Sequence, residues 1–201
     1  IKSVRLAGGH ARVLAAGGFA FESFALDPES ESDEELVERA ARALESARES
    51  AVTQGRFRRT PARLVKVRPI RDEIRLNPKK DPRRVSLEEK KALLEKYNNA
   101  ILSKRSRGVY TTNITYYESF GERLLVTTEG TCVRQEIIFC RLAGRVITRD
   151  GARIQEMSFS LGCTDDFSKL EGREEVVEGA TKIAIDLLKA EPVKAGVYTC
   201  I

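Results

Sequence analysis

Histidine and cysteine, which often catalyse reactions or bind metal ions, are few in this sequence. The 201 residues contain one histidine, His10, and four cysteines, Cys132, Cys140, Cys163 and Cys200. The cysteines lie too far apart for a C-x2-C metal motif, so we interpret them as buried free thiols. A zinc site built on a single imidazole would need an unusual set of distant ligands. His10 follows two glycines, which indicates a turn or strand-edge histidine and not a general base.

The signature motifs of several large enzyme classes are missing from the sequence. It contains no G-x4-G-K-[ST] phosphate loop, no G-x-S-x-G elbow, no H-E-x-x-H helix and no G-x-G-x-x-G loop after a strand. We therefore assign no catalytic, cofactor-binding or metal-binding residue in this chain. Apolar runs of only a few residues predict no transmembrane helix and no membrane partner. The first residues do not resemble a secretion signal, so we expect a cytoplasmic protein.

A hairpin followed by a helix is predicted for residues 1–55. Apolar alternation over residues 11–23 is interrupted at Gly17 and Gly18, as in a β-hairpin. Ser32 with Glu35 three positions later is typical of a capping box at a helix start. The expected apolar stripe of this helix consists of Leu36, Ala40, Leu44, Ala47 and Ala51.

Residues 56–85 are predicted to form a basic, proline-containing linker. Residues 56–84 include twelve Lys or Arg and three Asp or Glu, which give a net charge of +9 in a chain whose total is +5. Pro61, Pro69, Pro78 and Pro82 disfavour a helix and favour an extended path. Such a segment could bind nucleic acid, but the chain has no RNP-like motif, so we prefer a solvated connector.

Residues 86–201 are predicted to form a central helix, an antiparallel sheet and a closing helix. Ser86 and Glu89 repeat the capping-box pattern, and the helix is expected to end near Ser103. Its apolar stripe is expected at Leu87, Leu94, Tyr97 and Ile101. The closing helix starts at Glu174 and should cover one face of the sheet with Val176, Ala180, Ile183 and Leu187.

Between these helices the pattern is rich in β-formers and predicts a meander of four or five antiparallel strands. The expected strands cover residues 109–117, 124–128, 132–148 with a break at Gly144, and 152–163. Turns are expected at Phe120-Gly121, Glu129-Gly130 and Asp150-Gly151. The predicted fold class is α+β, with a small hairpin-helix unit followed by an antiparallel β-meander packed with helices.

Several segments in this order resemble the N-terminal portion of the TldD/PmbA family, also called the modulator of DNA gyrase family. They are G-H-A-R-V-L at residues 9–14, G-G-F-A at 17–20, E-R-A-A-R-A-L at 38–44, D-P-R-R-V-S-L-E-E-K at 81–90, Y-Y-E-S at 116–119, T-T-E-G at 127–130 and A-E-P-V at 190–193. The likeness covers most of the chain apart from residues 56–80.

The resemblance implies a cytoplasmic, zinc-dependent peptidase of modified or partly unfolded peptides, in which two subunits enclose a chamber. The family's H-E-x3-H helix and distant Cys ligand belong to its C-terminal half and have no counterpart here. We therefore expect no cofactor in this chain and zinc in the C-terminal half of the parent. The Ile1 start and the apolar end at residues 196–201 are interpreted as those of an N-terminal fragment.

The leading hypothesis is a non-catalytic N-terminal portion that encloses substrate and forms the dimer of a TldD/PmbA-like metallopeptidase. Its partners would be a second TldD/PmbA-type subunit, in a homo- or heterodimer, and a peptide substrate. Three alternatives stay open. The chain could belong to the inactive partner subunit of such a peptidase, be a nucleic-acid-binding module that uses the basic linker, or be a structural or adaptor protein without an enzyme parent.

Overall fold

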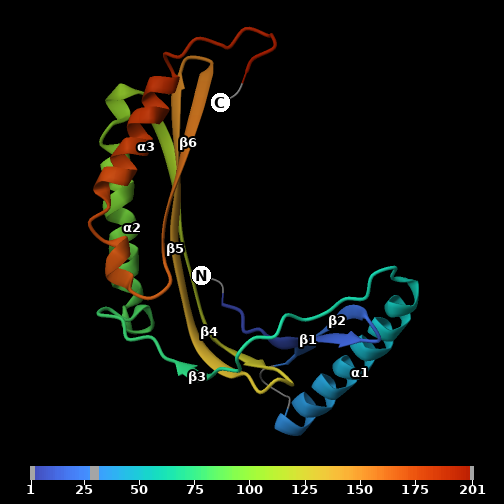
Figure 1. Cartoon of the computed structure of the whole chain (residues 1–201). Helices are drawn as coiled ribbons and strands as arrows, with labels where there is room; N and C mark the ends of the chain where they lie inside the picture. The colour runs from blue at the N-terminus through green and yellow to red at the C-terminus, as the bar shows by residue number, and fades with distance from the viewer. Residues whose placement is uncertain (1–2, 28–31, 200–201) are drawn as a thin grey trace. The chain divides into compact units, whose positions relative to one another are not determined.

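Helices and antiparallel strands occur in both parts of the chain, which confirms the predicted α+β class. The computed structural model describes residues 3–27 and 32–199 (Figure 1). The chain divides into two units, Ile1–Arg68 and Pro69–Ile201. We describe each unit by itself.

The first unit contains the predicted hairpin, formed by β1 (Ala7–Ala15) and β2 (Gly18–Leu26). The two strands pair antiparallel from Ala7 opposite Leu26 to Ala15 opposite Gly18. Ala16 and Gly17 form the connection with φ values of 49° and 76°. Two consecutive positive φ values are typical of the tight turns whose twist matches a hairpin. The turn therefore lies one residue before the predicted Gly17-Gly18.

Helix α1 (Asp33–Phe57) begins with the predicted capping box. The Ser32 backbone N–H donates to Glu35 Oε2 at 2.7 Å, and the Glu35 N–H donates to Ser32 Oγ at 3.3 Å. These two bonds satisfy N–H groups that the first turn of a helix leaves without partners.

The predicted apolar stripe of α1 is only partly correct. Ala47 and Ala51 are buried, but Leu36 and Leu44 are exposed, and Ala43 is buried in their place. The reason is the short distance between α1 and the hairpin. A Cβ on Gly18 would lie 1.9 Å from the Ala51 carbonyl oxygen, so only small side chains fit between the two elements.

The second unit contains a four-stranded sheet in its described residues, with β5 (Cys132–Asp150) in the centre. β4 (Val109–Val126) pairs antiparallel with β5 along nearly its whole length. β6 (Arg153–Cys163) pairs antiparallel with the second half of β5, and β3 (Arg71–Ile74) pairs parallel with its first four residues.

Two predicted interruptions of the sheet are wrong, so three long antiparallel strands replace the predicted four or five. Phe120 and Gly121 continue β4, where they lie opposite Ile138 and Ile137 of β5. Gly144 continues β5 opposite Phe159, whose ring occupies the space beside it; a Cβ on Gly144 would lie 2.3 Å from that ring. A glycine flanked by paired residues stays in the ladder and needs no turn.

The other two predicted turns are confirmed, because β4, β5 and β6 are joined at Glu129-Gly130 and Asp150-Gly151. Gly130 and Gly151 have φ values of 102° and 56°. Glycine adopts this left-handed backbone conformation without the steric cost that a Cβ would impose.

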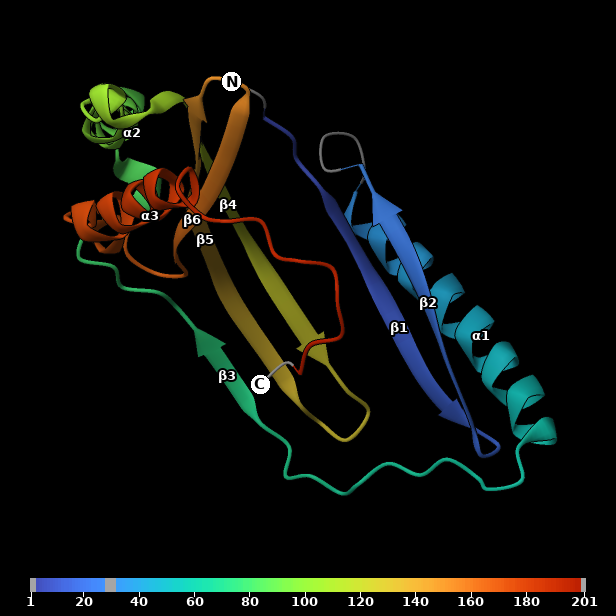
Figure 2. The same ribbon diagram turned by 90° about the horizontal axis from the view of Figure 1, so that it is seen from above.

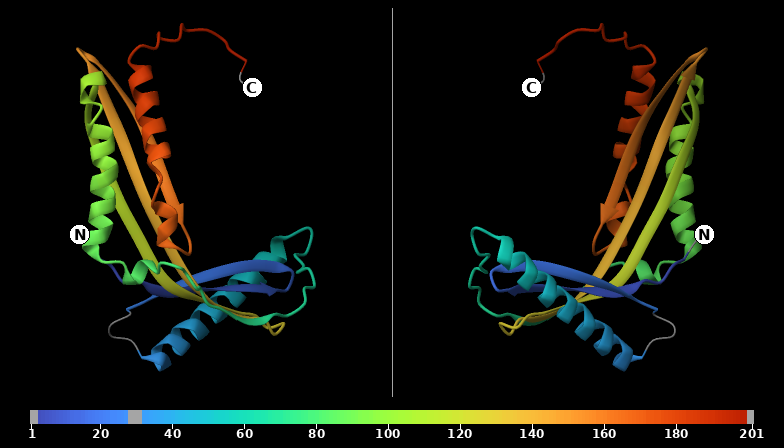
Figure 3. Two further views of the ribbon diagram at one scale, coloured as in Figure 1. Left: turned by 90° about the vertical axis from the view of Figure 1, so that its left-hand side faces the viewer. Right: turned by 90° about the vertical axis from the view of Figure 1, so that its right-hand side faces the viewer.

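Helices α2 (Leu87–Leu102) and α3 (Glu174–Leu187) lie on the same face of this sheet (Figures 2 and 3). The predicted cap of α2 is present, since Ser86 Oγ accepts from the Glu89 N–H at 3.1 Å. The described residues of the unit also include three short 3-10 helices, at Pro82–Arg84, Arg105–Arg107 and Phe167–Leu170. The core between helices and sheet contains Tyr97, Ile101, Ile138, Leu142, Val146, Phe167 and Leu170.

The predicted stripes of these helices are correct in part. Tyr97 and Ile101 of α2 are buried, whereas Leu87 is exposed. On α3, Ala180 is buried, but the predicted Val176 and Ile183 are exposed. The buried face of α3 consists instead of Val177, Ala180, Thr181 and Ala184.

A hydrogen bond explains why α3 turns small residues toward the sheet. Thr148 Oγ1 of β5 donates to the Ala184 carbonyl oxygen at 2.9 Å, which requires close approach of helix and sheet. Thr181 is tolerated in the buried face because its hydroxyl donates to the Val177 carbonyl oxygen at 2.7 Å.

The segment predicted as a linker contains regular elements, and two of the three cysteines that the structure describes are buried. α1 extends to Phe57, and β3 and the first 3-10 helix fall within residues 56–85. Cys140 and Cys163 are buried free thiols, as predicted, but Cys132 is exposed because it starts β5 beside a turn. Cys200 lies outside the described residues.

Candidate functional site

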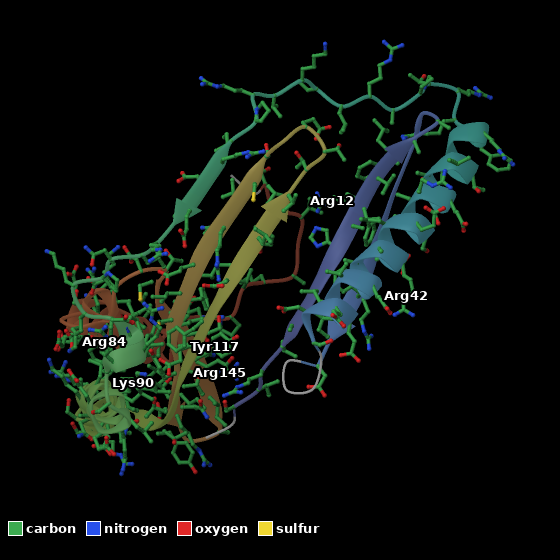
Figure 4. The ribbon with its side chains drawn as sticks, turned by 90° about the horizontal axis from the view of Figure 1, so that it is seen from below. Arg12, Arg42, Arg84, Lys90, Tyr117 and Arg145 are labelled. Atoms are coloured by element: carbon green, nitrogen blue, oxygen red, sulfur yellow. The ribbon has the colours of Figure 1, made fainter. Side chains whose placement is uncertain are left out.

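The described helices of the second unit cover only one face of its sheet. Side chains alternate along each strand, and those on one side pack against α2 and α3. We call the opposite side the open face. Its residues include Tyr117 and Arg145, which are labelled in Figure 4. The strand register adds Phe139, Arg141, Glu156 and Ser160 to the same face.

The open face combines an aromatic pair with two cationic positions. The rings of Tyr117 and Phe139 lie with centroids 6.0 Å apart and planes tilted by 59°. Arg141 Nε donates to Ser160 Oγ at 2.9 Å. Arg145 pairs with Glu156 at 3.4 Å, and both side chains stay more than half exposed. Such a surface offers apolar contact and hydrogen-bond donors to a ligand.

The outer edge of the same sheet is also available for pairing. β4 is an edge strand, because its only ladder in the described residues is the one to β5. An edge strand presents backbone N–H and C=O groups that can pair with an added extended chain. The open face and this edge together can hold a peptide in an extended conformation.

A charged network lies on the covered side of β4. Lys90 Nζ of α2 pairs with Glu118 Oε2 at 2.7 Å, and Tyr116 OH donates to the same oxygen at 2.8 Å. Lys90 Nζ also lies 5.7 Å from the centre of the Tyr116 ring. Figure 4 labels Lys90 on α2, apart from Tyr117 and Arg145. Each polar group has a partner inside the network, so it holds α2 on the sheet.

The groups buried beside this network keep their protons at neutral pH. Burial raises the pKa of Cys140 to about 11 and also raises the pKa of Cys163. Burial is likewise the main cause that raises the pKa of Tyr116, and the adjacent Cys140 and Glu118 add to it. A thiol with a raised pKa is a poor nucleophile.

Asp166 carries the opposite shift in pKa. Hydrogen bonds from Ser168 and from the backbone N–H groups of Lys79 and Lys80 lower its pKa to about 2. The Asp166 carboxylate accepts from Ser168 Oγ at 2.7 Å and from the Lys79 N–H at 2.8 Å. It therefore caps the 3-10 helix Phe167–Leu170 and fixes residues 79 and 80.

The residues that the sequence suggested for catalysis or metal binding do not lie together in the structure. His10 lies in the middle of β1, exposed and opposite Ser23. Across residues 3–27 and 32–199, no group of three or more His, Cys, Asp or Glu side chains could hold a metal ion. The described residues therefore do not fit a zinc site. No helix among them is long and apolar enough to cross a membrane.

The basic segment is partly neutralised by acidic neighbours. Arg75 pairs with Glu73 at 2.9 Å, and Arg83 pairs with Asp81 at 2.9 Å. Lys80 pairs with both Glu89 and Glu171. These cations are engaged within the second unit, which reduces the charge that the segment can offer to nucleic acid.

Sequence reasoning did not find the open face. The signal was the alternation in β4 and β5, where Tyr117 and Phe139 fall on the opposite phase from Ile114 and Ile138. The interruptions predicted at Gly121 and Gly144 obscured that phase.

Comparison with known proteins assigns this sequence to a family. Residues 80–188 match the model of the PmbA/TldA metallopeptidase central domain. A curated protein of Synechocystis sp. (strain ATCC 27184 / PCC 6803 / Kazusa), named a metalloprotease, is 30% identical over 196 residues, which are 96% of this chain. The chain spans 39% of the length of that relative. The crystal structure of TldE from Thermococcus kodakarensis has a TM-score of 0.47 and 15% identity, and covers 89% of this chain and 36% of that one.

Proposed function

Because this chain belongs to the TldD/PmbA metallopeptidase family, we propose that it forms the non-catalytic, substrate-enclosing and dimer-forming part of a peptidase for unfolded or modified peptides. The observation that supports this role most directly is the open face beside the free edge of β4. A protease that admits only unstructured chains needs a wall that binds an extended backbone without cutting it. In this proposal the zinc and the residues that use it belong to the part of the parent outside these 201 residues.

The proposed partner is a second TldD/PmbA-type subunit. Leu36, Val37 and Leu44 are 38%, 66% and 50% exposed, and their spacing places them on one side of α1. An apolar helix face in water is typical of a surface that another chain covers. Sedimentation of the chain at micromolar concentration tests this idea. Leu36→Lys with Leu44→Lys should lower the associated fraction, and Leu64→Lys, at a residue that is 61% exposed, is the control.

A peptide-binding assay tests the proposed role of the open face directly. We expect the chain to bind a fluorescein-labelled, unstructured ten-residue peptide, and Tyr117→Ala to weaken that affinity at least about fivefold. The matched control is Tyr110→Ala, because Tyr110 and Tyr117 are 57% and 58% exposed on the same strand. Equal losses in both variants would contradict a specific open-face site.

Mass spectrometry of the same peptide shows whether the chain only binds the peptide or also cleaves it. We expect the peptide to keep its mass after incubation with residues 1–201. Hydrolysis that persists through repurification and stops with a chelator would overturn the non-catalytic assignment, even if the peptide also binds.

A further inference from the structure

Helices α2 and α3 end at the same end of the second unit (Figures 1 and 3). Residues at this end line a basic groove. Its volume is about 1050 Å³, which is large enough for a ligand of many atoms. The walls come from the last turns of the two helices, the 3-10 helix Arg105–Arg107 and the end of β5. The groove is separate from the open face proposed to bind peptide.

Cations outnumber carboxylates around this groove by two to one. The basic residues are Lys104, Arg105, Arg107, Arg149, Lys182 and Lys189, and the acidic ones are Asp150, Glu178 and Asp186. In the described part of the chain none of the six cations forms an ion pair, whereas Lys80, Lys90 and Lys96 of the same unit all do. Strand alternation puts the Arg149 side chain on the side of Arg145, so five cations against three carboxylates leave the groove an excess of two positive charges.

Helix ends account for only part of that excess. The C-terminal end of a helix carries roughly half a negative charge, and cations near it are stabilising. Two such ends, at Leu102 and Leu187, amount to about one negative charge. The side chains exceed this amount, so the groove can still attract an anion.

Arg149 contributes its backbone to the groove wall. Its side chain has the strand phase of Arg145 and points away from the helices, where Nε donates to the Gly151 carbonyl oxygen at 2.9 Å and the guanidinium lies 5.5 Å from the centre of the Tyr110 ring. The cations available to a ligand in the groove are therefore Lys104, Arg105, Arg107, Lys182 and Lys189.

We propose that this groove binds an oligophosphate through Lys104, Arg105, Arg107, Lys182 and Lys189. A chain of phosphates places several negative charges within the span of the groove, and guanidinium groups match phosphate oxygens with two parallel hydrogen bonds. None of the described lining residues is aromatic, so a nucleobase would find no ring to stack on. The lining includes no residue of β4 or β6, the two edge strands at this end, so an extended peptide would find no strand edge in the groove.

Calorimetric titration of the whole chain with inorganic tripolyphosphate tests the proposal. We expect saturable binding that weakens steeply between 50 and 200 mM salt. Arg105→Glu with Arg107→Glu should lower the affinity roughly tenfold or more. Lys182→Glu with Lys189→Glu changes the opposite wall and should have the same effect. Circular dichroism checks that each variant is folded.

The matched control is Arg58→Glu with Arg59→Glu, which makes the same charge change in the first unit. We expect its affinity to stay within about twofold of the parent. Similar losses in control and groove variants would reduce the binding to net charge and overturn the site. An absence of binding would overturn it as well, and neither result bears on peptide binding at the open face.

Two further ligands identify the source of the phosphates. Equal affinity for ATP and tripolyphosphate supports recognition of the phosphate chain alone, and clearly tighter ATP binding supports a nucleotide as its source. Hexaglutamate binding as tight as that of tripolyphosphate would contradict the oligophosphate assignment in favour of an acidic peptide.

Discussion

In the described residues of Ile1–Arg68 the buried apolar side chains are all alanines, whereas those of Pro69–Ile201 include Tyr97, Phe167 and Ile101. Alanine removes little apolar area from water, so the first unit gains less from burial. It compensates by close approach of backbones, as at Gly55, where a Cβ would lie 2.2 Å from the Ala16 carbonyl oxygen. The first unit should therefore be most sensitive to added atoms and the second to removed atoms.

Adding atoms to the first unit gives the largest expected effect. Gly55→Val places a branched side chain against the hairpin backbone, and we expect it to cost about 3 kcal/mol or more. Hydrogen exchange followed by mass spectrometry should show lost protection in β1, β2 and α1 alone. The control is Gly179→Val on α3, where a Cβ meets nothing within 4 Å. Protection lost in both units would contradict their independence.

Removing atoms from the second unit comes next. Leu142 of β5 is fully buried, and we expect Leu142→Ala to lower the free energy of unfolding by about 2–5 kcal/mol. Urea denaturation measures the change. Leu124→Ala on β4, where the side chain is 65% exposed, should stay within about 0.5 kcal/mol. A small effect at Leu142 would mean that apolar burial stabilises the second unit as little as the first.

Removing one oxygen from the second core tests its polar contacts. Tyr97 OH donates to the Leu170 carbonyl oxygen at 2.6 Å and accepts from the Arg173 N–H at 3.0 Å. Tyr97→Phe leaves both groups without this partner, so we expect a loss of about 1–3 kcal/mol in urea denaturation. Tyr110→Phe, at an exposed residue, is the control. Equal stability of both variants would show that the core relies on packing alone.

The smallest expected effect depends on pH. The pKa of Asp166 is about 2 in the folded chain, below its ordinary value of 3.8. Its carboxylate therefore adds stability above pH 4, and this contribution is lost as the pH falls from about 4 to about 2. The difference in urea midpoint between the parent and Asp166→Asn should shrink over that range. A difference that is constant with pH would assign the effect to shape and not to charge.

Local signals in the sequence predicted the elements well. Ser32 and Ser86 mark helix starts because their side chains bond to N–H groups three residues later. Gly130 and Gly151 mark turns because the backbone there has positive φ. Such features depend on a few neighbouring residues and can be read without the fold.

Features that depend on distant partners could not be predicted. Leu36 and Leu44 fit an apolar stripe, but the hairpin lies so close that only alanines enter the contact. The continuity of β4 through Gly121 depends on pairing with β5. The open face required the strand phase, and the basic groove required the joint position of α2, α3 and the end of β5.

The contact between Gly144 and Phe159 also restricts which residues related proteins can have at these two positions. The ring occupies the place that a side chain at residue 144 would need. A larger residue at 144 is therefore tolerated only after the ring at 159 has been lost. Across related sequences the residues at positions 144 and 159 should therefore vary together.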